Sequence, residues 1–269
     1  AGINWFDTAE VYGAGESEKA LSRALKTSGR NPGEVIVATK WWPAFRFASN
    51  IAKTIDQRIK LLDPYPIDLY QVHQPWSFSR ETAEMAQMTE LINKKLIKAV
   101  GVSNFNARKM ENAWKALRKS NIPLASNQVR YSLLDRKIES NGVMDLAKRL
   151  GVTIIAYSPL AQGLVTGKFH DKPELLKNIG FRRYNPQFSR EGLEKSRPVV
   201  NLVKDLAARY NVTPSQVALN WIIQYHGDTV VAIPGATKES HVNENCGAMS
   251  FSLSAEDMAR LDKASSIFK

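Results

Sequence analysis

Seven short apolar runs recur along this chain, and the ends of the first six are 25 to 33 residues apart. Each run is rich in β-branched residues and has the length of a buried strand. Because that interval is the length of one strand followed by one helix, the series predicts a parallel sheet. The runs are INWFDT, VIVATK, DLYQVH, AVGVS, ASNQV, TIIAYS and VVAIPG, and the first six end near positions 7, 40, 73, 103, 128 and 158.

The stretches between these runs have the periodicity of amphipathic helices. Apolar residues three and four positions apart form one face of a helix. Strands followed by helices are typical of a closed (β/α) barrel, and a doubly wound open sheet has the same local pattern. The helical faces include Ile51, Ile55, Ile59 and Leu62, then Met110, Ala113, Trp114 and Leu117, and Val143, Leu146, Ala147 and Leu150.

Seven strands are one fewer than a closed barrel of this kind requires. The first run begins at Ile3, so we expect the first strand-helix unit of the barrel to be absent from this chain. A length of 269 residues with 43% hydrophobic content favours one domain over residues 1–269. An irregular basic segment at residues 169–190 is a candidate lid, and helices are expected near 193–210, near 214–224 and after Ser254.

Composition excludes several classes of protein. The net charge of +11 suits a phosphate-rich ligand, but the basic residues are scattered and do not alternate with aromatic residues, which argues against nucleic acid. No uninterrupted run of eighteen apolar residues occurs, so we expect no membrane insertion. Cys246 is the only cysteine, which excludes an internal disulfide and a cysteine-built zinc site, and we expect no metal.

We expect a cytoplasmic protein, since a single cysteine suits a reducing compartment. The first residue is Ala1 and not Met, so the sequence does not exclude an organellar targeting segment before it. The sequence leaves the oligomeric state undetermined.

Polar side chains stand at the ends of the first three runs, where a parallel barrel places its active site. Asp7, Lys40 and His73 end these runs, and Tyr12 follows Asp7 in the next loop. An ammonium beside a tyrosine favours the phenolate and so makes the phenol a better acid. Asp7 would keep Lys40 protonated, and His73 could donate a hydrogen bond to a substrate oxygen. Such a site can protonate a carbonyl oxygen, but the hydride must come from a nicotinamide.

Motifs along the whole chain resemble the aldo-keto reductase superfamily, in its bacterial, plant and potassium-channel-β-like branch more than in the aldose reductase branch. They are FDTAEVYG, VATK, LYQVH, AVGVSNF, NQVRY, AYSPLAQG and IPGATKESHVNEN. The resemblance implies a (β/α)8 TIM-type barrel that reduces aldehydes or ketones with NADPH. It places the catalytic tetrad on Asp7, Tyr12, Lys40 and His73, with Tyr12 as the general acid.

The same resemblance implies a set of cofactor contacts. Ser103, Asn104 and Gln128 would bind the nicotinamide carboxamide, and Tyr157 would stack on the ring. NADPH is expected because Lys238 and His241 would meet its 2′-phosphate. His241 stands where many relatives have Arg or Gln, which leaves NADH as the less favoured alternative. The remaining contacts are Ser158, Leu160 and Gln162 near the pyrophosphate, Thr237, Lys238, His241, Glu244 and Asn245 at the adenosine end, and Lys168.

Aromatic residues after the strand ends suggest an apolar pocket for a small carbonyl substrate. Trp41, Trp42 and Trp76 are the candidates.

Two other functions fit parts of the pattern. A nicotinamide-binding regulatory subunit, similar to potassium-channel β subunits, would share the FDTAEVY stretch, but His73 and Asn104 favour an enzyme. An aldolase with Lys40 as Schiff-base lysine is disfavoured, because Asp7 would raise the pKa of Lys40 when such a lysine needs it lowered.

Overall fold

The computed structural model describes residues 2–269, and the chain contacts divide it into two compact units. The N-terminal unit comprises Gly2–Val129 and Gly142–Ile154, and the C-terminal unit comprises Arg130–Asn141 and Ile155–Lys269. All seven predicted strands are present. The expectation of a single domain stays a prediction.

The first five strands are parallel and paired in sequence. The pairing puts Lys40 beside Gln71, Gln71 beside Gly101, and Gly101 beside Ser126. Because side chains alternate between the two faces of a strand, this row shares one face of the sheet. The strands are β1 (Trp5–Asp7), β2 (Ile36–Trp41), β3 (Ile67–Val72), β4 (Ile97–Ser103) and β5 (Leu124–Arg130).

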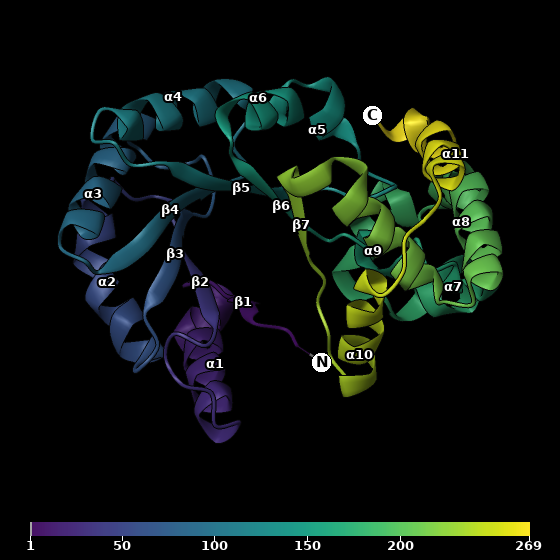
Figure 1. The fold of residues 1–269 in the computed structure, drawn as a ribbon, viewed down its shortest axis with the longest axis horizontal. Helices are drawn as coiled ribbons and strands as arrows, with labels where there is room; N and C mark the ends of the chain where they lie inside the picture. Colours follow the sequence, from purple (N-terminus) through teal and green to yellow (C-terminus); the bar gives the residue numbers. More distant parts are fainter. Residues whose placement is uncertain (1) are drawn as a thin grey trace. The chain divides into compact units, whose positions relative to one another are not determined.

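Helices follow the strands of the N-terminal unit as the periodicity predicted. Figure 1 shows α2, α3 and α4 lying along the outer side of β2 to β4, each packed against its neighbour. The apolar faces of these helices supply buried residues such as Ile55, Met88 and Met110. The helices are α1 (Glu16–Thr27), α2 (Ser49–Leu62), α3 (Glu81–Asn93), α4 (Ala107–Arg118) and α6 (Val143–Leu150).

Strand β2 separates two polar environments. Thr39 faces the helices and donates a 2.6 Å hydrogen bond to Glu18 of α1, which is paired with Arg58 of α2 at 3.1 Å. Lys40, the next residue, faces the opposite side of the sheet and is completely buried. The alternation of the strand therefore sends Lys40 away from the buried Glu18–Arg58 pair.

The C-terminal unit contains the rest of the fold. The strands are β6 (Thr153–Tyr157), whose first two residues belong to the N-terminal unit, and β7 (Val230–Ile233). The segment expected to be irregular forms α7 (Lys168–Asp171) and three short 3-10 helices at Pro173–Asn178, Gly180–Tyr184 and Pro186–Phe188. The other helices are α5 (Lys137–Ser140), α8 (Arg190–Tyr210), α9 (Pro214–Tyr225), α10 (Glu239–Cys246) and α11 (Ala255–Ser265).

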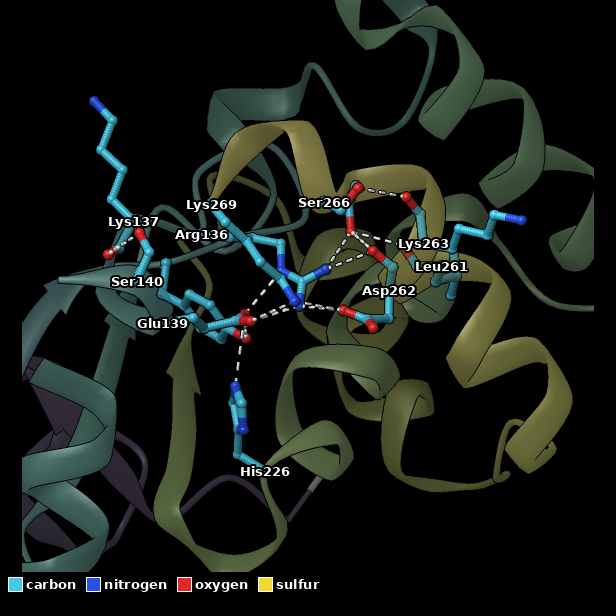
Figure 2. Close-up of polar contacts among 12 residues, drawn as sticks. Arg136, Lys137, Glu139, Ser140, His226, Leu261, Asp262, Lys263, Ser266 and Lys269 are labelled. Carbon is cyan, nitrogen blue, oxygen red and sulfur yellow. Dashed lines mark hydrogen bonds and ion pairs between the residues drawn. The ribbon is translucent and has the colours of Figure 1, made fainter. Parts of the chain in front are cut away.

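The final helix, α11, begins where the sequence predicted. Ser254 accepts a hydrogen bond from the Asp257 backbone amide, which satisfies one free donor of the first turn. The helix packs on α8 and α9. Its other end is held by Arg136, whose guanidinium lies between Glu139 and Asp262 (Figure 2).

No helix within residues 2–269 is both long and apolar enough to cross a membrane. The same residues contain no group of three or more His, Cys, Asp or Glu side chains that could hold a metal ion.

Candidate active site

Lys40 and Asp7 form a direct ion pair at the ends of β2 and β1. The Lys40 amine also donates a 2.8 Å hydrogen bond to the Thr8 carbonyl. The Lys40 side chain is fully buried and the Asp7 side chain is 10% exposed. An ammonium enclosed in this way has little water around it, so its protonation depends on these two partners.

The second oxygen of Asp7 accepts amide hydrogens from two glutamines. Gln128 of β5 donates at 2.9 Å and Gln71 of β3 donates at 3.4 Å, both to Oδ1. Since Oδ2 contacts Lys40, the carboxylate is held from both sides. These bonds fix the direction in which Asp7 faces the amine.

Tyr12 lies near the same amine. The Lys40 Nζ is 5.2 Å from the centroid of the Tyr12 ring, and the His73 ring meets the Tyr12 ring edge-on at 5.7 Å. Tyr12 is 42% exposed, so its ring is open to solvent and to a small molecule. The structure therefore brings all four predicted tetrad residues, Asp7, Tyr12, Lys40 and His73, into one cluster within the N-terminal unit.

The loop that holds Tyr12 is tied to β2 and closed by a glycine. The Glu10 amide donates to the Lys40 carbonyl at 3.1 Å, and the turn ends at Gly15 with a φ of +97°. A Cβ at this position would lie 2.8 Å from the side chain of Leu61. The backbone angle favours glycine there, and any larger residue would also have to displace the end of the Leu61 side chain.

Burial sets the charge states of the two nitrogen bases. It lowers the pKa of Lys40, and the opposing effect of Asp7 does not fully compensate. Burial, aided by the charge of Lys40, lowers the pKa of His73 to about 4. His73 is therefore neutral at pH 7, and it can donate a hydrogen bond without adding a second positive charge.

Three predicted carboxamide contacts lie beside this cluster. Ser103 donates to the Gln128 carbonyl at 2.9 Å, and Asn104 donates to the Ser103 hydroxyl at 3.1 Å and to the His73 carbonyl at 3.4 Å. Asn104 has a φ of +61°, a backbone conformation that asparagine tolerates better than most residues. The Ser103 and Asn104 side chains and the Gln128 backbone carbonyl form one hydrogen-bonded group at the ends of β4 and β5.

The other predicted cofactor contacts belong to the C-terminal unit. Tyr157 ends β6 and is partly exposed, and Ser158 and Gln162 have positive φ values in the turn that follows. Leu160 is partly exposed in this turn, and the exposed Lys168 begins α7 with its amine 4.9 Å from the centroid of the Phe169 ring.

The predicted adenosine contacts lie at and within α10. Thr237, Lys238 and His241 are exposed, and Lys238 is the residue before the first turn of the helix. Glu244 is partly exposed and accepts a 2.7 Å hydrogen bond from Thr213, and Asn245 is also partly exposed.

The three tryptophans proposed for a pocket separate into two environments. Trp42 meets the His73 ring at 5.2 Å and the Trp76 ring at 6.0 Å, and Trp76 is 57% exposed. Trp41 is instead fully buried and donates a 3.0 Å hydrogen bond to Asn50 of α2. The strand alternation that turns Lys40 toward the site turns Trp41 toward the helices, so the structure places Trp41 in the core and not in a pocket wall.

Two residues of this region were not predicted. Gln71 contacts Asp7, and its position two residues before His73 on one strand would have placed it on the same face. Glu10 accepts the Trp42 amide at 2.9 Å and the Arg46 guanidinium at 2.7 Å. No sequence pattern indicated this link between the two loops.

Comparisons with known proteins identify the family of this chain. The model of the Aldo/keto reductase family matches residues 1–266. The chain belongs to the aldo/keto reductase family. An uncharacterized oxidoreductase of Mycobacterium bovis is 36% identical over 272 residues, covering 100% of this chain and 79% of that protein. The match supports assignment of this family member as an oxidoreductase.

Solved structures confirm the fold class. The glycerol dehydrogenase AKR11B4 of Gluconobacter oxydans aligns with a TM-score of 0.85 at 28% identity, covering 98% of this chain and 81% of that one. An aldo/keto reductase of Klebsiella pneumoniae in complex with NADP and acetate aligns with a TM-score of 0.74 at 25% identity, covering 97% and 80%. The chain thus has the (β/α)8 barrel fold, of which residues 2–269 contain seven strands.

Proposed function

We propose that this protein reduces aldehydes or ketones to alcohols with NADPH, with Tyr12 as the proton donor. The observation that supports it most directly is the position of the Lys40 amine, held by Asp7 and 5.2 Å from the Tyr12 ring centroid. A positive charge beside a phenol stabilises the phenolate that remains once the proton has left. Tyr12 would act as the acid. Lys40, held by Asp7, would make the Tyr12 hydroxyl more acidic.

His73 and Trp42 would position the carbonyl group. Because His73 is neutral, its ring can donate one hydrogen bond to the carbonyl oxygen and leave the proton transfer to Tyr12. The edge of Trp42 against His73 limits how the imidazole can turn, and Trp42 and Trp76 would form the apolar wall. We propose these two tryptophans, without Trp41, for the substrate pocket.

The side chains fit a nicotinamide cofactor. Gln128 donates to Asp7 through its nitrogen, which leaves its amide oxygen as an acceptor for the carboxamide, next to Ser103 and Asn104. Tyr157, Ser158, Leu160, Gln162 and Lys168 would hold the ring and the pyrophosphate. When bound, the cofactor supplies the hydride.

The adenosine end would bind at α10. The exposed Lys238 and His241 lie at the start of this helix, where backbone amides also favour an anion. They would favour the 2′-phosphate of NADPH over NADH. Thr237, Glu244 and Asn245 would complete this end of the site. The complex of the Klebsiella relative with NADP supports this choice of cofactor.

The test measures NADPH consumption with a panel of aldehydes and ketones. The wild-type protein should turn over, and Tyr12→Phe should lower kcat by about 100-fold or more, the range of general acid catalysis. Tyr210→Phe is the matched control, because Tyr210 ends α8 and its hydroxyl contacts Asp257 of α11, outside the proposed site, so its loss should leave kcat unchanged.

NADPH binding, followed by quenching of protein fluorescence, separates the alternatives. Binding without turnover in the wild type would instead support a regulatory nicotinamide-binding protein. Equal turnover in the wild type and Tyr12→Phe would refute the role of Tyr12.

A further inference from the structure

Gln71 lies in the buried row that contains Lys40. Its register partners are Lys40 on β2 and Gly101 on β4, and Gly101 is paired in turn with Ser126 on β5. The Gln71 side chain is completely buried. A Cβ on Gly101 would lie 2.9 Å from the Gln71 Cγ and 2.5 Å from the Ser126 hydroxyl, so both side chains flank the space that this glycine leaves.

Of the two polar atoms of the Gln71 amide, one has a hydrogen-bond partner and the other does not. Its nitrogen donates to Asp7 Oδ1 at 3.4 Å, and its oxygen has no hydrogen-bond partner among the described residues. Only the nitrogen end of an amide can face a carboxylate favourably, so Asp7 determines the orientation of Gln71. A buried oxygen without a partner costs stability, and an apolar side chain of the same size would avoid this cost. Filling space does not explain a glutamine at this position.

We infer that Gln71 is a positioning residue for the reaction, which acts by holding Asp7 toward Lys40. This inference rests on the proposed function of the tetrad. Gln71 and Gln128 approach the same oxygen of Asp7 from β3 and β5, and the other oxygen contacts Lys40. Gln128 is also a proposed cofactor contact, whereas Gln71 is the donor with no other partner.

The effect reaches Tyr12 through Lys40. The charged and titratable groups that act on the Lys40 amine are Asp7 on β1, His73 after β3 and the Tyr12 ring, with a weaker effect of Glu18 on α1 from the other side of the sheet. Burial lowers the pKa of Lys40, while Asp7 and Glu18 raise it. A less well held Asp7 would oppose burial less, so Lys40 would lose its proton at a lower pH.

The first experiment compares Gln71→Met with Ser126→Ala in the full chain. Methionine has nearly the volume of glutamine but cannot donate, and Ser126 is the neighbour whose hydroxyl has no hydrogen-bond partner among the described residues. Gln71→Met should lower kcat by about tenfold, as expected for one hydrogen bond to a charged group. It should also move the alkaline limb of the kcat profile to lower pH, while Tm stays equal or rises. Ser126→Ala should change neither kcat nor the pH profile.

A second variant, Gln71→Glu, tests the donor directly. The introduced carboxyl can donate to Asp7 only while it holds a proton, since an ionised carboxylate has no hydrogen to donate. Asp7 beside it would favour the protonated form. Its kcat relative to the wild type should therefore recover as the pH falls, which Gln71→Met should not show. This contrast does not depend on small differences in folding between the variants.

The outcomes separate this inference from the proposed function. Unchanged kcat and an unchanged pH profile in Gln71→Met, with Tyr12→Phe inactive, would overturn the role of Gln71 alone. A fall in kcat that matches a fall in Tm, with no change in the pH profile, would also overturn it by showing a purely structural role. Absence of turnover in the wild type would instead contradict the proposed function.

Discussion

Lys40 and Arg136 are both fully buried cations, but the protein surrounds them differently. Lys40 has one carboxylate and one backbone carbonyl as partners. Arg136 binds Glu139 with two nitrogens at 2.8 and 2.6 Å, and it also donates to the Asp262 carboxylate at 2.6 Å, the Asp262 carbonyl at 2.9 Å and Ser265 at 2.7 Å (Figure 2). Its guanidinium lies 4.7 Å from the Trp221 ring.

The pKa shifts of the two cations follow from these partners. Burial lowers the pKa of Lys40 despite Asp7. Burial would also lower the pKa of Arg136, but the hydrogen bonds to Glu139 and Asp262 outweigh it and raise the value. The Arg136 cluster joins α5 to α11 with its donors satisfied, whereas the Lys40 amine keeps a charge that is only partly compensated beside Tyr12. The first arrangement suits a structural link and the second suits chemistry.

The largest expected effect comes from removing the cation of the proposed active site. Lys40→Met should lower kcat by roughly 1000-fold, because Tyr12 loses the charge that stabilises its phenolate. Steady-state NADPH oxidation checks it, with the exposed Lys53→Met on α2 as the control. If Lys40→Met kept more than a tenth of the wild-type kcat, Lys40 would not have the catalytic role that distinguishes it here from Arg136.

The matching change in the other region should act on stability. Arg136→Met should lower the free energy of unfolding by roughly 3 kcal/mol, since it leaves the buried Glu139 without its main partner. Urea unfolding followed by fluorescence measures this difference. At a temperature where the variant is folded, its kcat should stay within about twofold of the wild-type value. This change is smaller than the loss of one hydrogen bond in the active site would cause. A loss of kcat as large as in Lys40→Met would contradict the comparison.

A smaller effect concerns the pH dependence of the Arg136 cluster. Burial would raise the pKa of Glu139, but its contacts with His226, Arg136 and Tyr131 lower it below its ordinary value of 4.5. A carboxyl with a lowered pKa stabilises the fold fully above its unfolded pKa, and this contribution is lost as the pH falls through its folded pKa. Glu139→Gln should therefore be less stable than wild type by roughly 1 to 3 kcal/mol at pH 7.

That difference should shrink steadily as the pH falls below 4.5. Urea unfolding at a series of pH values measures it. The exposed Glu256→Gln at the start of α11 is the control and should show no comparable trend. A difference that stays constant down to about pH 2 would mean that the charge of Glu139 contributes little.

The sequence predicted the repeated strands and helices well, because the period of apolar residues depends on local geometry. It also placed Asp7, Lys40 and His73 at strand ends, since polar residues that end buried runs stand out. It missed Gln71 and Glu10, and it placed Trp41 in a pocket wall. These positions depend on strand register and on which face a side chain takes, and the pattern of single segments does not specify the register between strands.

The sequence by itself determined the order of the elements, the seven strands and the candidate chemistry of the tetrad, because each follows from residue types and their spacing along the chain. The tertiary structure decided which buried cation is fully hydrogen-bonded and which is not. Charge states inside a protein depend on burial and on partners far apart in sequence, such as Asp7 with Gln128 and Arg136 with Asp262. Only the folded chain brings these groups within hydrogen-bonding distance.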